Sequence, residues 1–196
     1  MSNKALIIST CAKHGLLRNQ AAYVLATAEW ETNRTYLPVE EAYYVKNAEA
    51  WRKKNLRYYP WHGRGFVQIT WEANYRKAGE KIGVDLISDP SRAMIPENAA
   101  EILVLGMRDG WFTGKKLADY ITLKRSDFLN ARRIINGTDK APDIAILARQ
   151  HDADLKMLGY GTEPVEPQPT APAKPANWFM ALIKFLLSLL PKRKSK

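Results

Sequence analysis

A proline-rich stretch divides the chain and limits how much of it can share one core. The residues EPVEPQPTAPAKPAN, positions 163–177, contain five prolines and no aliphatic run. This composition is typical of a semi-rigid extended linker, because proline has no backbone N–H and interrupts helices and sheets. We therefore expect a folded domain over residues 1–161, a linker over 162–177 and a separate segment over 178–196. About 160 residues are enough for one domain with a real core.

The last segment, WFMALIKFLLSLLPKRKSK, reads as an apolar helix with a basic end. Lys184 and Ser188 interrupt the apolar residues 178–190, and they lie four positions apart, on one helical face. Thirteen residues at about 1.5 Å each reach roughly 20 Å, short of the roughly 30 Å hydrocarbon core of a bilayer. We predict an interfacial helix that binds an anionic membrane surface. Docking on the domain or on a second chain, and a short tilted span, are the alternatives.

The net charge of +10 predicts an anionic partner, which leaves nucleic acid, an anionic membrane and an acidic cell-wall polymer open. Residues 167–196 hold six Lys or Arg and no acidic residue, so the tail contributes +6 and the remainder +4. Because the excess lies mainly in the tail, we expect no nucleic-acid partner. We also expect a monomer.

The N-terminus and the cysteine content bound the location and the chemistry. The single cysteine, Cys11, excludes an internal disulfide framework. The apolar run from Ala5 to Ile8 is too short for the apolar region of a signal peptide, so we expect no export by the ordinary secretory route. The three histidines share no metal-ligand spacing, and we predict neither a metal nor another cofactor.

Within residues 1–161 the apolar spacing is mostly helical. The sequence therefore predicts a mainly α domain, with at most a small β element near residues 65–70. Asn19 is the candidate N-cap of a first amphipathic helix, QAAYVLATAEWET. Further helices are predicted at 97–109 after Pro96, between an N-cap at Ser126 and a stop at Gly137, and over 141–158. The basic run 52–54 is interpreted as a solvated face.

Two carboxylates are placed as a pair that can cleave a glycosidic bond. The apolar stripe of the first helix, continued three residues beyond Ala28, reaches Glu31. Burial and the negative end of the helix dipole both disfavour ionisation there, and a protonated carboxyl is what a general acid requires. Nine residues on, after Pro38, Glu40 has a more polar setting, in which we expect a charged carboxylate that acts as a base. The alternative is an ordinary helix end and an ordinary turn residue.

The stretch YYPWHGRGFVQITWEANYRKAG, which begins at Tyr58, has the composition of a sugar-binding wall. Tyr59 and Trp61 lie beside a glycine turn, and aromatic rings of this kind line grooves for sugars. Neutral donors and acceptors for hydroxyl and N-acetyl groups come from Gln68, Thr70 and Asn74. On an extended backbone the side chains of Gln68 and Thr70 point the same way. The alternative is a packed junction between two lobes.

This stretch resembles the loop of glycoside hydrolase family 19, the chitinase-like and endolysin-like group. The family pattern is a Tyr-Tyr-Gly-Arg-Gly segment, a Gln-hydrophobic-Ser/Thr step and an Asn-Tyr pair, and the pair falls on Asn74 and Tyr75. Upstream, AEWET resembles the family's His-Glu-Ser/Thr element, whose catalytic acid falls on Glu31. Downstream, ARRIINGT resembles its Ile-Asn-Gly-Gly element, whose substrate-contacting asparagine falls on Asn136. The likeness covers about residues 20–140.

The resemblance also places the second carboxylate. In phage-type members a second glutamate stands shortly before a tyrosine, which falls on Glu40 with Tyr44; the neighbouring Glu41 competes for the role. Four residues depart from the family pattern, namely Trp30, Asn33, Arg34 and Thr138. These departures concern the shape of the first subsite more than the chemistry.

The resemblance implies a two-lobed, lysozyme-like fold and a single displacement with inversion. Glu31 then protonates the leaving oxygen, while Glu40, helped by Thr70, deprotonates a water on the opposite face. Family members cut β-1,4 links next to N-acetylglucosamine, in chitin or in peptidoglycan. We expect an endolysin that waits in the host cytoplasm and acts on peptidoglycan in the periplasm. The alternatives are a chitinase and a non-catalytic wall-binding or membrane-binding module.

Overall fold

Helices make up most of residues 1–161, the part of the chain that the computed structural model describes. These residues form one compact unit that ends at Gly161. The predicted linker and the apolar helix of 178–196 lie outside the described residues. The elements follow in the order α1 Asn3–Lys13, α2 Arg18–Glu31, β1 Val39–Glu40, α3 Ala48–Asn55, β2 Arg64–Gly65, α4 Glu72–Ile82, η1 Pro90–Met94, α5 Pro96–Asp109, α6 Leu117–Tyr120, β3 Ile121–Thr122, β4 Arg125–Ser126, η2 Asn130–Ile134 and α7 Ala141–Met157, where η marks a 3₁₀ helix.

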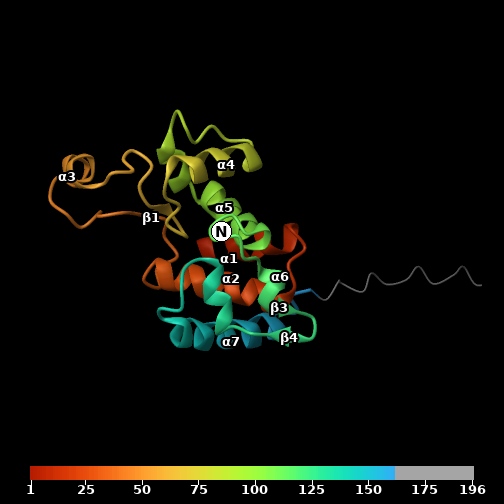
Figure 1. Cartoon of the computed structure of the whole chain (residues 1–196). Helices are drawn as coiled ribbons and strands as arrows, with labels where there is room; N and C mark the ends of the chain where they lie inside the picture. Colours follow the sequence, from red (N-terminus) through yellow and green to blue (C-terminus); the bar gives the residue numbers. More distant parts are fainter. Residues whose placement is uncertain (162–196) are drawn as a thin grey trace, which may run out of the picture. The chain divides into compact units, whose positions relative to one another are not determined.

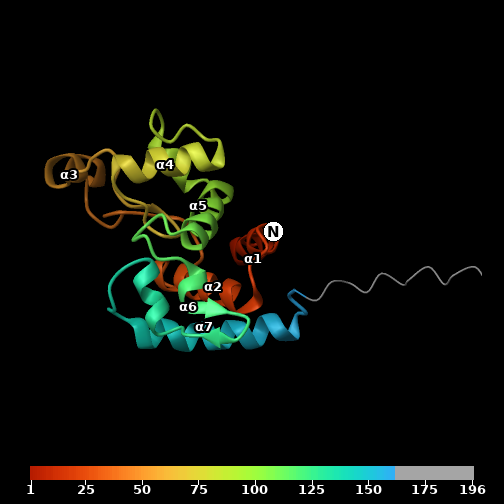
Figure 2. The same ribbon diagram turned by 45° about the vertical axis from the view of Figure 1, so that its right-hand side comes forward.

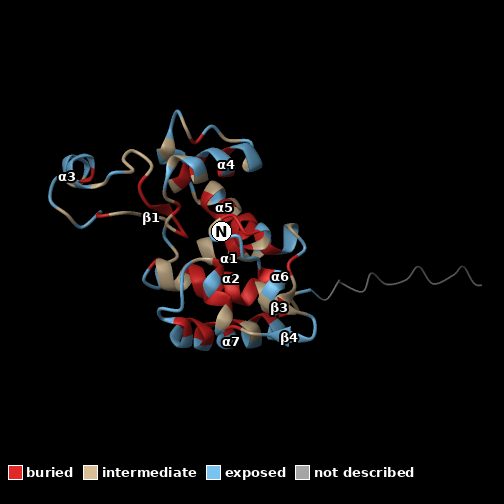
Figure 3. Cartoon of the chain, viewed as in Figure 1, coloured by how far each residue is buried: buried red, intermediate tan, exposed pale blue. Residues whose placement is uncertain are grey.

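The helix α2 is the centre of the core. The residues Ala21 to Ala28 are all buried, so the helix is enclosed on every side and not only along the predicted stripe. It packs most extensively on α7 and also contacts α1 and α5. Figure 3 shows this burial as a red band through the middle of the domain. Glu31, the last residue of α2, is therefore carried by the most firmly packed element of the protein.

The helices fall into two groups, as predicted for a two-lobed domain. In Figures 1 and 2, α2, α6 and α7 lie on one side, α4 and α5 lie on the other, and α1 lies between them. The helix α3 stands apart from both groups in Figure 1. The link from the first group to the second is the segment after α2, which leads through β1 to α3.

The β structure is small and antiparallel. In the first pair Val39 lies opposite Gly65 and Glu40 opposite Arg64; a bridge between Arg64 and Ile69 closes the turn that follows. The predicted short β element near 65–70 is therefore present, although its partner strand comes from the segment before α3. The second pair joins β3 to β4. Among the helices of residues 1–161, none combines the length and the apolarity needed to cross a membrane.

The start of α5 and the position of α7 were predicted from the sequence and are confirmed. The helix α5 begins at Pro96, where the missing N–H of proline costs no helical hydrogen bond, and Gly110 follows it in a left-handed conformation with φ 75°. The helix α7 covers the predicted last helix.

Two predicted caps are wrong because tertiary contacts use these residues. Asn19 lies inside α2, and its side-chain amide donates hydrogen bonds to the Thr122 carbonyl and the Ser126 hydroxyl, both at 2.8 Å. Ser126 ends strand β4 instead of beginning a helix, and the helix predicted there is reduced to the 3₁₀ turn η2. The polar side chains of Asn19 and Ser126 thus join α2 to the β3–β4 hairpin.

A cluster of titratable side chains fastens the end of α2 to α7. The Glu29 carboxylate accepts a hydrogen bond from the Tyr36 hydroxyl at 2.9 Å and lies 2.7 Å from His151 Nε2. His151 is buried, and its Nδ1 has no partner among residues 1–161. Burial holds the pKa of His151 below its ordinary value, although the bond to Glu29 acts in the opposite direction. His151 is therefore neutral in the folded protein near neutral pH.

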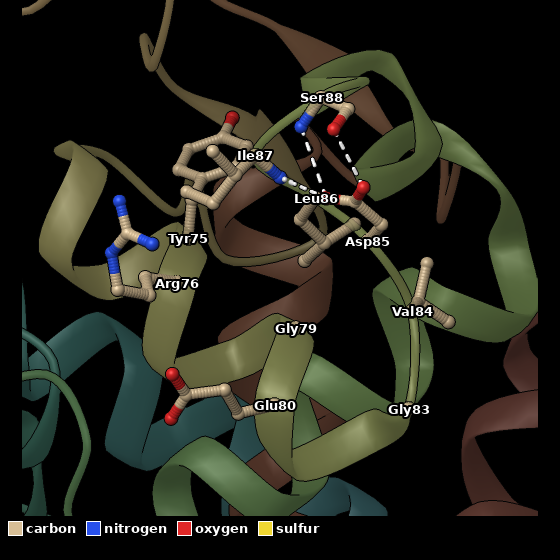
Figure 4. Close-up of a pocket in the computed structure, with 10 residues that line it drawn as sticks. All are labelled: Tyr75, Arg76, Gly79, Glu80, Gly83, Val84, Asp85, Leu86, Ile87 and Ser88. Atoms are coloured by element: carbon tan, nitrogen blue, oxygen red, sulfur yellow. Dashed lines mark hydrogen bonds between the residues drawn. The ribbon is translucent and has the colours of Figure 1, made fainter.

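A shallow pocket of about 480 Å³ lies between α4 and the loop that follows it. Figure 4 shows Gly79 on α4 facing the strand-like segment that runs from Val84 to Leu86. A β-carbon at Gly79 would lie 2.6 Å from the Val84 carbonyl oxygen, which belongs to the backbone and cannot rotate away. Glycine at this position therefore allows the close approach of α4 and its loop.

We expect Gly79→Ala to lower the free energy of unfolding by roughly 1–3 kcal/mol, the usual cost of overpacking a close contact. The control is Gly137→Ala, because no heavy atom lies within 4 Å of the added β-carbon there. Urea unfolding of both variants measures the effect. Equal stabilities of the two variants would contradict the prediction.

Acidification should destabilise the protein through its buried histidines. Below a pH of about 6.5 the unfolded chain binds protons that neutral His151 does not bind, so the free energy of unfolding falls as the pH falls. One such histidine contributes a slope of at most about 1.4 kcal/mol per pH unit. We expect His151→Gln, which keeps an amide donor, to flatten the slope in urea unfolding between pH 7.5 and 5.5. An unchanged slope would show that His151 does not titrate differently on folding.

Candidate active site

Glu31 ends α2 and is held by a buried arginine from a distant part of the chain. Arg132 Nη1 donates a hydrogen bond to Glu31 Oε1 at 2.8 Å, and Arg132 Nε donates to the Asp139 carbonyl. The Glu31 side chain is 20% exposed and that of Arg132 6%. No other residue of 1–161 bonds to the second oxygen, Oε2, so one oxygen of the predicted acid is free to face a substrate. Burial and the helix dipole at Glu31 were predicted from the sequence, but the contact with the Arg132 guanidinium was not.

Glu40 lies in β1 at the centre of three donors. His62 Nε2 lies 2.9 Å and Arg64 Nε 3.1 Å from Oε1, while Arg52 Nη2 lies 3.0 Å from Oε2. Arg64 reaches Glu40 because the two residues are opposite one another in the β1–β2 pair. Burial opposes ionisation of Glu40, but the His62 bond and the Arg52 and Arg64 charges outweigh it and hold the pKa below its usual value. The expectation of a charged carboxylate at Glu40 fits these surroundings.

Glu41, the competing carboxylate, has neutral partners. Its Oε1 accepts a hydrogen bond from the Tyr58 hydroxyl at 2.8 Å, and its Oε2 accepts one from the Gly63 backbone N–H at 2.9 Å. Both oxygens therefore hold the loop of residues 58–65 in place. Glu40 and Glu41 lie side by side in sequence but differ in charge environment.

The glycine-punctuated loop, which runs from Tyr58 to Trp71, is held together by the side chain of Gln68. This residue has a left-handed backbone with φ 55°, so the extended conformation predicted for Gln68 to Thr70 is wrong. Its side-chain Nε2 donates to the Val39 carbonyl at 2.7 Å, and its Oε1 packs so closely that a β-carbon at Gly63 would lie 2.7 Å away. The amide group of Gln68 therefore joins the loop to β1. The Thr70 hydroxyl donates to the Gln68 carbonyl at 2.9 Å and keeps its lone pairs available.

The Asn-Tyr pair lies in the first turn of α4, and its two members differ in exposure. Asn74 is half-buried and donates from its side chain to the Thr70 carbonyl at 2.8 Å. Tyr75 is fully buried; its hydroxyl donates to the His62 carbonyl at 2.6 Å and accepts from Arg64 Nη1 at 3.1 Å. The substrate contact predicted for Tyr75 is therefore corrected to a positioning role, because its side chain has no exposed surface.

The aromatic side chains of the loop are half-buried and fixed by neighbours. The Tyr59 ring stacks on His62 with centroids 5.9 Å apart, and its hydroxyl bonds to Glu49. Trp61 packs against the core, and its buried indole N–H has no partner among residues 1–161. An aromatic that the sequence analysis did not single out, Trp71, is 43% exposed beside Tyr58.

Asn136 lies on an exposed turn, four residues after Arg132. Its backbone N–H donates to the Arg132 carbonyl at 3.0 Å, and its side-chain oxygen accepts from the Gly137 N–H. The turn that carries Asn136 therefore also carries the arginine that holds Glu31. An exposed amide on the turn that also carries Arg132 fits the substrate contact that the family resemblance implies.

Three of the site's strongest interactions were not predicted. Arg52 was interpreted as part of a solvated face, yet it is buried and reaches both Glu40 and Glu49; only the two lysines that follow it are exposed. His62 and Arg132 were not assigned roles in the chemistry. The Glu49 to Arg52 spacing of three residues on a helix is a signal of an ion pair, but nothing in the sequence shows that Arg52 also meets Glu40. Residues 1–161 contain no cluster of three or more metal-ligating side chains.

Comparison with known proteins agrees with the motifs. Residues 25–102 match the family model described as chitinase class I, glycoside hydrolase family 19. The matched segment includes both predicted catalytic carboxylates and the whole glycine-punctuated loop. None of the curated proteins matches the chain. The resemblance to family 19 is thus confirmed over residues 25–102, and it supports a glycoside hydrolase of the chitinase and lysozyme-like kind.

Proposed function

We propose that the protein is an endolysin that cleaves the β-1,4 glycosidic bonds of peptidoglycan with inversion at the anomeric carbon. The observation that carries this proposal is the contrast between Glu31 and Glu40. Glu31 meets one arginine, Arg132, and has its second oxygen without a partner among residues 1–161, as a proton donor to a glycosidic oxygen requires. Both oxygens of Glu40 have partners, because it meets two arginines and His62, and the arginines favour its charged form. Two carboxylates with different surroundings are the minimal apparatus for this reaction.

The proposed reaction is a single displacement. Glu31 transfers a proton from Oε2 to the leaving oxygen, and the bond between that oxygen and the anomeric carbon breaks. Glu40 takes a proton from a water, whose oxygen forms the new bond at the opposite face, and the Thr70 hydroxyl accepts a hydrogen bond from the same water. This geometry requires carboxyl groups roughly 6.5–9.5 Å apart. After the turnover the proton on Glu40 must return to Glu31 through solvent.

Peptidoglycan is preferred to chitin because of charge. Residues 1–166 carry a net charge of +4 and the whole chain +10, and the peptide stems of peptidoglycan carry carboxylates, whereas chitin is uncharged. The proposed setting is the wall of a bacterial host, reached from the cytoplasm. The proposed partner of residues 178–196 is an anionic membrane surface, on the strength of their sequence alone. Chitin is the second candidate substrate, since the matched family model is that of chitinase class I.

Loss of turbidity of purified Gram-negative peptidoglycan tests the function. We expect the full-length protein to clear the suspension and Glu31→Gln to reduce kcat by about 10²–10⁴-fold, the usual contribution of a general acid, with little change in binding to the insoluble wall. Proton NMR of the fresh products reports the anomeric configuration, which should be inverted. Clearing of chitin but not of peptidoglycan would assign the second substrate. A Glu31→Gln variant that keeps full activity would remove the acid assignment.

The pair Glu40→Gln and Glu41→Gln tests the base. We expect Glu40→Gln to lose at least as much activity as Glu31→Gln. We expect Glu41→Gln to keep more of it, because its amide oxygen still accepts one of the two bonds that Tyr58 and Gly63 donate to the carboxylate. Circular dichroism and urea unfolding establish that each variant is folded. The reverse order of activities would make Glu41 the base.

A further inference from the structure

A closed ring of interactions surrounds Glu40 and passes through α3. Glu40 Oε1 bonds to His62 Nε2 at 2.9 Å, and Glu40 Oε2 pairs with Arg52 Nη2 at 3.0 Å. Arg52 Nη1 donates to Glu49 Oε2 at 3.3 Å, and the Tyr59 hydroxyl donates to the other oxygen of Glu49. The Tyr59 ring lies parallel to the His62 ring, at 11°, which completes the circuit. Each oxygen of Glu40 is therefore connected to the same exposed carboxylate, Glu49, by a separate route.

The members of the ring differ sharply in exposure. The side chains of His62 and Arg52 are 0% and 6% exposed, whereas that of Glu49 is 66% exposed. The buried members are fixed by packing, and a change in either one disturbs the fold. Glu49 is the member of the ring that can be substituted with little effect on the core, because most of its side chain is exposed to water.

His62 contributes a neutral donor to this ring. Its Nε2 faces Glu40, and its buried Nδ1 has no partner among residues 1–161. The charged groups around it are Glu40 from β1, Arg64 from β2 and Arg52 from α3. Burial lowers the pKa of His62, against the effect of the Glu40 bond, and the two arginines lower it further. The imidazole is therefore an uncharged N–H donor that orients Glu40, while the arginines supply the positive charge.

The ring joins Glu40 to an element that lies outside the helical core. Figure 1 shows α3 apart from the other helices. Arg52 and Glu49 are both on α3, three residues apart, and Arg52 Nε also donates to the Glu41 carbonyl at 2.6 Å. The position of α3 and the orientation of Glu40 are consequently set by the same contacts.

We propose that Glu49 and His62 are positioning residues for Glu40, and that through them α3 is part of the catalytic apparatus although it contacts neither reacting atom. The inference rests on the proposed function, in which Glu40 is the base. A base must hold its oxygen at a fixed angle and distance from the attacking water, and a long, flexible glutamate side chain does so only when both oxygens are restrained. Glu49 restrains one oxygen through Arg52 and the other through Tyr59 and His62.

Steady-state kinetics of full-length variants on soluble peptidoglycan fragments test the inference. Glu49→Ala removes both bonds, and we expect kcat to fall roughly 10- to 100-fold, the scale of a misplacement of about 1 Å, while KM changes less than about twofold. Glu49→Gln keeps one acceptor oxygen, for either Arg52 or Tyr59, and should recover part of the activity. The matched control is Asp109→Ala, which removes another partly exposed carboxylate that pairs with an arginine, Arg108. Its kcat should equal that of the wild type.

A double-variant cycle separates positioning from general loosening. Tyr59→Phe keeps the ring that stacks on His62 and loses the bond to Glu49, so Glu49→Ala combined with Tyr59→Phe should be no slower than Glu49→Ala alone. Unfolding midpoints of all variants are measured in parallel, and that of Glu49→Ala should stay close to the wild-type value. Multiplicative losses in the double variant would mean that the two residues act independently.

The outcomes distinguish the two proposals. If the wild type cleaves neither peptidoglycan nor chitin, the proposed function fails and the inference fails with it. If the wild type is active and Glu49→Ala keeps its kcat, or loses activity only in proportion to its stability, the inference alone is overturned. Retained activity of Glu40→Gln would also overturn the inference, since there would be no base at that position to orient.

Discussion

Three buried arginines determine how the site is built. Within residues 1–161 the buried arginines are Arg52, Arg64 and Arg132, and each one meets Glu40 or Glu31. A guanidinium stays charged in a protein, and burying it requires a carboxylate and further hydrogen bonds. Each buried guanidinium is therefore held by a residue that is also assigned to the proposed chemistry. Removal of one partner from a fully buried ion pair costs about 3–5 kcal/mol, and partial exposure of the two glutamates reduces that cost. Stability and reactivity are coupled in this site.

Local sequence rules predicted much of the helical framework. Proline at the start of α5 and the periodicity of α7 locate these helices because the determinants lie within the elements themselves. The errors at Asn19 and Ser126 have a different origin. Both residues have the chemistry of an N-cap, but their side chains bond to each other across more than 100 residues of sequence. An N-cap is predicted because the side chain of such a residue can bond to nearby backbone N–H groups. A hydrogen bond from the same side chain to a distant residue can be more favourable than this local bond.

The site was predictable to a similar degree. Glu31 follows from the helical stripe and Glu40 from the family pattern, and both lie in the matched segment. What the sequence does not show is which cation meets which carboxylate, because Arg132 is about 100 residues from Glu31 in the chain. The run that begins at Arg52 looks like any solvated basic face, and only the fold turns its first member inward. Tyr75 shows the opposite kind of error. The family motif includes this residue, but the motif does not indicate whether its side chain is exposed.

The eight residues between Glu31 and Glu40 form a segment of fixed shape. Three of them, none a glycine, have a left-handed backbone, namely Asn33, Arg34 and Tyr36. The backbone of this segment is anchored where Asn3 donates a hydrogen bond to the Tyr36 carbonyl at 2.8 Å. On the proposed mechanism this segment helps to set the distance between the two carboxyl groups, and the attacking water occupies the space between them. A shorter segment would bring the carboxyl groups toward the roughly 5 Å separation of retaining enzymes, where no water fits between them. On that mechanism the stereochemistry of the product depends on the length of this connection as well as on the two glutamates that it joins.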